Sequence, residues 1–69
     1  MEYRITWCGV SQYLVAEIDG REVCKSFCRT GGREADRLAR RWYRLHVARY
    51  GPLDWDGRVQ IPGFNSPLY

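Results

Sequence analysis

In this 69-residue chain, most of the residues whose type and spacing suit a chemical role are arginines. Of eleven Lys and Arg residues, ten are Arg, and seven of these lie from Arg33 onward. A guanidinium binds phosphate or carboxylate through two parallel hydrogen bonds. A stripe of arginines along one side of a helix could therefore bind a nucleic-acid backbone or an acidic protein surface. The alternative is that these arginines form an ordinary helix face exposed to solvent. The residues that recur at helical spacing are Arg33, Arg37, Arg40 or Arg41, and Arg44.

A second set of side chains lies on three predicted strands. Cations beside an aromatic ring suit phosphate contact and base stacking, and a small sheet can enter the major groove. An ordinary solvated face is the alternative, and Val15 and Val23 exposed together would favour a protein-binding face. The predicted binding residues are Arg4, Thr6, Tyr13, Glu17 and, depending on the register, Arg21 and Lys25.

Motifs for catalysis or metal binding are missing from the sequence. Cys8, Cys24 and Cys28 are an odd number of cysteines, which favours free thiols. Their spacing does not suit a zinc site completed by His46. No Walker loop or nucleophile elbow is present, and a plain turn explains Gly31-Gly32 better than a phosphate site. We therefore predict no enzyme activity, no catalytic residue, no metal or cofactor and no small-molecule substrate.

The helical arginines need one long helix, predicted over residues 32–50. Its apolar stripe is expected to face a sheet, and it consists of Ala35, Leu38, Ala39, Trp42, Leu45 and either Ala48 or the stem of Arg49. Thr30 or one of the following glycines can cap the start, and Glu34 suits the first turn. Gly51-Pro52 ends the helix, because glycine accepts a left-handed cap and proline cannot continue the ladder.

Alternating side chains predict strands over residues 2–7, 13–18 and 21–28. Asp19-Gly20 predicts a tight hairpin between the second and third strands. The register of the third strand stays open: a two-residue turn places Arg21 beside Ile18, whereas a longer turn places Cys24 there. The predicted fold class is α+β, a three-stranded antiparallel β-meander packed against one C-terminal α-helix, with an irregular C-terminal extension.

The chain is expected to form one domain, with a βββα unit over residues 1–52 and a turn-rich extension over residues 53–69. Arg58–Ile61 could form a short strand that ends at Pro62. The residues beyond are either pinned by aromatic and apolar side chains or disordered. The net charge of +3 is mild and permits nucleic-acid binding without demanding it. Without an apolar run or a signal peptide, we expect a cytoplasmic protein with no membrane contact.

Several short motifs stand out along the chain: Gly9-Val10, Tyr13–Ile18, Asp19-Gly20-Arg21, Lys25-Ser26-Phe27 and Glu34 through Trp42. Together they resemble the AP2-like DNA-binding domains, to which the arm-binding domains of tyrosine integrases are structurally related. The resemblance covers about residues 3–50. That family places the outer face of its sheet in the major groove of duplex DNA.

The resemblance implies roles for individual residues of this chain. Ala16 and Ile18 match core positions of the second strand, and Glu17 matches a position that can reach bases. Arg21 matches a basic contact, and Phe27 matches the aromatic that packs under the helix. The arginine-rich first strand of the plant proteins is missing, since only Arg4 stands there.

Two hypotheses of function follow. The first is a small AP2-like module that contacts duplex DNA through arginines and the outer sheet face. The second is a phage or mobile-element protein, similar in kind to an anti-CRISPR, that inhibits a host protein or ribonucleoprotein complex by binding its surface. Tryptophan, tyrosine and arginine dominate interface hot spots, which makes the composition compatible with the second hypothesis.

Overall fold

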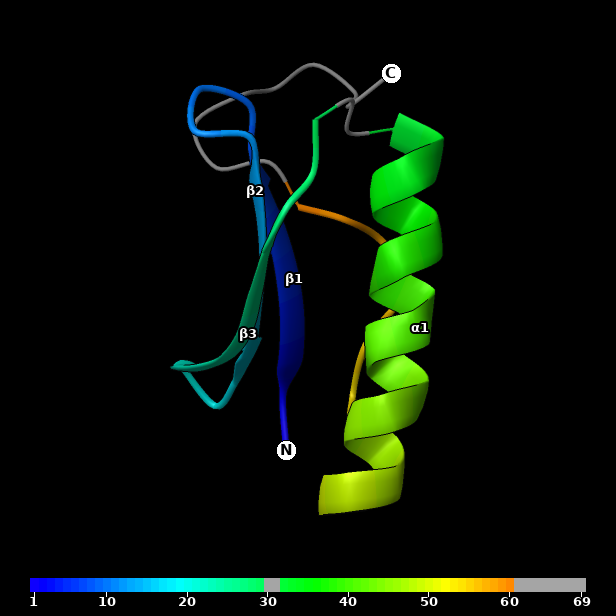
Figure 1. The fold of residues 1–69 in the computed structure, drawn as a ribbon. Helices are drawn as coiled ribbons and strands as arrows, with labels where there is room; N and C mark the ends of the chain where they lie inside the picture. Colours follow the sequence, from blue (N-terminus) through cyan, green and yellow to red (C-terminus); the bar gives the residue numbers. More distant parts are fainter. Residues whose placement is uncertain (30–31, 61–69) are drawn as a thin grey trace.

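The computed structural model describes residues 1–29 and 32–60, and it confirms the α+β prediction. Strands β1 (Tyr3–Cys8), β2 (Tyr13–Ile18) and β3 (Arg21–Phe27) form one antiparallel sheet in the order β1-β2-β3. Helix α1 (Gly32–Tyr50) lies against one face of this sheet (Figure 1). We call the opposite face of the sheet the outer face.

The core fills the space between the sheet and α1. Small helical residues let the helix approach the sheet closely, because an alanine projects only one carbon from the backbone. The buried apolar side chains are Tyr3, Ile5, Leu14, Ala16 and Ile18 from the sheet, Ala35, Ala39 and Trp42 from α1, and Cys28 and Leu53 outside these elements. This confirms the core positions that the family resemblance gave to Ala16 and Ile18.

The apolar stripe of α1 differs from the prediction at Leu45, whose side chain is 58% exposed, and at Ala48 and Arg49, which are also exposed. Tyr43 and Val47 pack against the core instead. The cause is the segment that follows the helix, because it turns back along the side of α1 that carries Tyr43. The Tyr43 hydroxyl donates a hydrogen bond to the carbonyl of Leu53 at 3.0 Å, and the Tyr43 and Trp55 rings lie 5.1 Å apart.

The C-terminus of α1 forms as predicted at Gly51. This residue has a φ of 90°, and its N–H donates to the carbonyl of Val47 at 2.9 Å. The bond satisfies one of the carbonyls that a helix end leaves without a partner. The proposed N-terminal caps Thr30 and Gly31 lie outside the described residues.

The β2–β3 hairpin has the predicted two-residue turn, with positive φ at Asp19 (51°) and Gly20 (84°). Positive φ at both central residues defines a type I′ turn. Ile18 therefore pairs with Arg21. A bulge then changes the register, so that Ala16 pairs with Cys24 and Val23 is the extra residue. The register thus combines a tight turn with a bulge, which neither alternative of the sequence analysis included.

The bulge decides which side chains of β3 face the helix. Without it, Ala16 would pair with Val23, and Lys25 would lie opposite buried Leu14 on the core side. Burying an unpaired ammonium costs far more than exposing an aromatic ring, for which the cost is about 2–3 kcal/mol. The bulge therefore places Lys25 and Phe27 on the outer face. The prediction that Phe27 packs under the helix is wrong, since Phe27 is 57% exposed.

The described part of the C-terminal extension runs beside the free edge of β1. Tyr3 N–H donates to Asp54 O at 2.9 Å, and Trp7 N–H donates to Gln60 O at 3.0 Å. Both contacts are parallel bridges, and they cover an edge that would otherwise offer unpaired backbone groups. Residues 58–60 of the predicted strand contribute only the bridge at Gln60, and Ile61 lies outside the described part.

Candidate functional site

The arginine face of α1 is the densest cationic surface in the part of the chain that the structure describes. At 3.6 residues per turn, its members lie within an arc of about 100°, and the buried Trp42 lies on the opposite side of the helix. From first to last they span about 16 Å along the axis. The face consists of Arg33, Arg37, Arg40, Arg41 and Arg44, all exposed.

The recorded ion pairs do not neutralise the arginines of this face. Among the described residues the structure records two ion pairs, Arg4 with Glu2 and Arg58 with Asp56, and neither involves an arginine of α1. A hollow of about 260 Å³ opens on the same surface, lined by Glu34, Arg37, Leu38 and Arg41. Arg37 and Arg41, one helical turn apart, thus line the same hollow, together with the carboxylate of Glu34.

The outer face of the sheet forms three cross-strand rows. Arg4, Glu17 and Glu22 make the first row, and Thr6, Val15 and Lys25 make the second. Cys8, Tyr13 and Phe27 make the third row. Five of the predicted sheet residues thus share one face: Arg4, Thr6, Tyr13, Glu17 and Lys25.

Arg21 does not join them. It pairs with the buried Ile18, and directly paired residues point to the same side of a sheet. The Arg21 side chain is therefore exposed at the rim of the helix-facing side. Val23 also leaves the outer face, because it packs against the core beside the bulge.

Charges on the outer face are mixed. A guanidinium nitrogen of Arg4 lies 3.2 Å from a carboxylate oxygen of Glu2. This ion pair weakens the attraction that Arg4 offers to a phosphate. Lys25 lies 4.7 Å from the centre of the Tyr13 ring, a cation–π distance. Glu17 and Glu22 face each other across β2 and β3, and this acidic pair repels phosphate.

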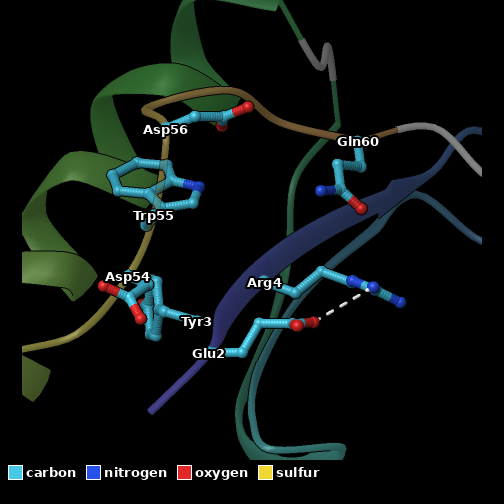
Figure 2. A pocket seen from close by; sticks show the side chains of 7 residues that line it. All are labelled: Glu2, Tyr3, Arg4, Asp54, Trp55, Asp56 and Gln60. Atoms are coloured by element: carbon cyan, nitrogen blue, oxygen red, sulfur yellow. Dashed lines mark hydrogen bonds and ion pairs between the residues drawn. The ribbon is translucent and has the colours of Figure 1, made fainter.

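A groove of about 480 Å³ lies between β1 and the returning segment (Figure 2). Between the two parallel bridges β1 advances from Glu2 to Thr6, whereas the returning segment advances from Asp54 to Gln60. Between the bridges the returning segment therefore contains two more residues than the strand beside it. Its lining is Glu2, Tyr3, Arg4, Asp54, Trp55, Asp56 and Gln60. With three carboxylates and one guanidinium, this groove does not suit a phosphate.

His46 lies at the edge of the core, where the Tyr3 hydroxyl contacts its Nδ1 at 2.7 Å. Burial lowers the pKa of His46, and the nearby Arg49 lowers it further. Burial also raises the pKa of Tyr3 far above its usual value. The phenol therefore keeps its proton, and the hydrogen bond that its hydroxyl shares with Nδ1 fixes the imidazole ring. This bond positions the helix on β1 and gives no nucleophile.

The cysteines remain free thiols in three different environments. Cys28 is buried, whereas Cys8 and Cys24 are half-buried. A hydrogen bond from Ser11 lowers the pKa of the Cys8 thiol, and burial raises the pKa of Cys24. Among residues 1–29 and 32–60, no three His, Cys, Asp or Glu side chains are placed to hold a metal ion.

Sequence reasoning missed Glu22 and Phe27 as members of the outer face and the lining of the β1 groove. The bulge and the long-range pairing of Asp54 and Gln60 decide these positions, and neither leaves a local signal. No family model matches the chain, and no match was found among curated proteins or solved structures. None of the described helices is both long and apolar enough to cross a membrane.

Proposed function

We propose that this chain is a non-enzymatic nucleic-acid-binding module whose arginine face contacts the phosphates of duplex DNA. The observation that carries the proposal is the clustering of five exposed guanidinium groups on the side of α1 opposite the core. The face is about 16 Å long. B-DNA presents one charge per about 1.7 Å of axis, so about ten phosphate charges lie along this length. Every arginine of the face can thus find a phosphate.

The geometry favours the helix over the sheet as the main contact surface. In the AP2-like mode the outer face would enter the groove, and Glu17 and Glu22 would approach the phosphates there. Their repulsion opposes the attraction of Arg4 and Lys25. We therefore assign the electrostatic affinity to the arginine face, while base reading from the outer face, with Glu17 as the residue that reaches bases, stays a prediction.

The proposal is tested by titrating the purified chain against fluorescent duplex DNA at several salt concentrations. Five phosphate contacts predict a log–log salt slope of about −4.5, because each contact contributes about −0.9. Replacing Arg37, Arg40 and Arg44 with Gln should flatten the slope by about 2.7. Glutamine is a good helix former, so the variant should keep its fold.

The matched control replaces Arg4, Arg21 and Lys25 with Gln. This variant loses the same charge from the sheet side of the molecule, and we expect it to keep most of the affinity and slope. An equal loss in both variants would show that affinity follows net charge rather than a site. Failure of the unmodified chain to bind DNA at low salt would refute the proposal and favour the protein-binding alternative.

A further inference from the structure

The outer face exposes two adjacent aromatic rings that do not belong to the core. Phe27 is 57% exposed and Tyr13 is 38% exposed, and their ring centres lie 6.0 Å apart. Within residues 1–29 and 32–60, no helix or strand lies over this face (Figure 1). Aromatic side chains are enriched in the cores of protein interfaces, which makes this pair a candidate contact for another molecule.

The first row of the same face contains two glutamates that form no recorded ion pair within the described part of one copy of the chain. Glu17 and Glu22 lie side by side, and no ion pair among the described residues joins either of them to a cation. Directly opposed like charges destabilise a sheet. The Arg4 guanidinium, at the far end of the row, is paired with Glu2 instead. A cation supplied from outside would complement Glu22.

We infer that the outer face binds a second copy of this chain, with the twofold axis running along β2. This axis exchanges β1 with β3, so Arg4 of each copy lies over Glu22 of the other. Phe27 and Tyr13 meet the same row of the partner, and Val15 lies on the axis against its own copy. The pairing is reciprocal, as a twofold interface requires.

The size of the face sets the strength of association. Three strands at about 4.8 Å spacing and six residues at about 3.3 Å rise give a patch of about 14 by 20 Å. This is about 280 Å² per copy, or about 560 Å² for both copies, well below the roughly 1,200 Å² that a stable interface buries, so we expect a weak, transient dimer that forms only toward millimolar concentration. The arginine faces would then lie on opposite sides of the dimer, and one dimer could join two nucleic-acid segments.

Sedimentation velocity of the full chain from the micromolar to the millimolar range tests the proposal. We expect the mass to rise from one chain to two with concentration. Phe27→Ser should weaken the dimer about tenfold, because it removes the most exposed aromatic ring of the outer face. The control Leu45→Ser removes an equally exposed apolar side chain, 58% exposed on α1, and should leave the association unchanged. A chain that stays monomeric at every concentration would overturn the proposal and leave this face to a different partner.

Two glutamates distinguish this twofold arrangement from general stickiness. The axis places Glu17 against its own copy, so Glu17→Gln should strengthen the dimer. Glu22→Gln should weaken it, because the partner's Arg4 loses its carboxylate. Arg4→Glu and Glu22→Arg should each weaken association, and the two together should restore it. Equal effects of both glutamine variants, or a charge swap without recovery, would refute this pairing.

Discussion

Replacing Trp42 with Ala tests whether the contact between α1 and the sheet holds this fold together. Trp42 is 6% exposed and lies on the helix face that meets the core. A tryptophan buries about 150–250 Å², which at 25 cal/mol per Å² corresponds to about 4–6 kcal/mol. Because alanine keeps part of that burial and the site partly collapses, we expect a loss of about 3–5 kcal/mol.

That loss is comparable with the whole stability of the chain. At about 0.05–0.15 kcal/mol per residue, a chain of this length has about 3–10 kcal/mol of unfolding free energy. The Trp42→Ala variant should therefore be largely unfolded or close to its midpoint without denaturant. Trp42→Phe keeps most of the buried area and should stay folded with reduced stability.

Urea unfolding followed by far-ultraviolet circular dichroism gives the free energies, with Leu45→Ala as the matched control. Leu45 lies on the same helix but is 58% exposed, so its replacement should change the stability by no more than about 0.5 kcal/mol. A cooperative Trp42→Ala variant of nearly unchanged stability would refute the packing argument. Equal losses at both positions would show that Leu45 belongs to the core after all.

Four further perturbations have expected outcomes. Gly51→Ala should cost about 1–2 kcal/mol in urea unfolding, because a side chain at a φ of 90° strains the backbone and no nearby atom contacts it. The pKa of His46 is lowered in the folded chain, so the unfolded chain binds more protons below about pH 6.5. The free energy of unfolding should therefore fall as the pH drops below that value. In His46→Gln, the urea midpoint should depend less on pH. Tyr43→Phe should cost about 0.5–1.5 kcal/mol and speed amide exchange in the returning segment, whose carbonyl it contacts. Iodoacetamide should modify Cys8 first and reach Cys28 only on unfolding, as peptide mass mapping would show; early modification of Cys28 would contradict its burial.

The sequence by itself determined the elements that depend on neighbouring residues. The helix over residues 32–50 and its glycine end follow from side-chain period and from the conformational freedom of Gly51. The Asp19-Gly20 turn follows from the positive φ that both residues accept. The arginine face also follows from spacing alone, since a helix fixes which residues share a side.

Only the tertiary structure decided the features that depend on distant contacts. The bulge at Val23 forms because β3 must keep Lys25 out of a core built by β2 and α1, and this choice moves Phe27 to the surface. The segment around Asp54 returns to pair with β1, and it shifts the buried side of α1 from Leu45 toward Tyr43. Such choices compare the energies of whole arrangements, which no local pattern of residues records.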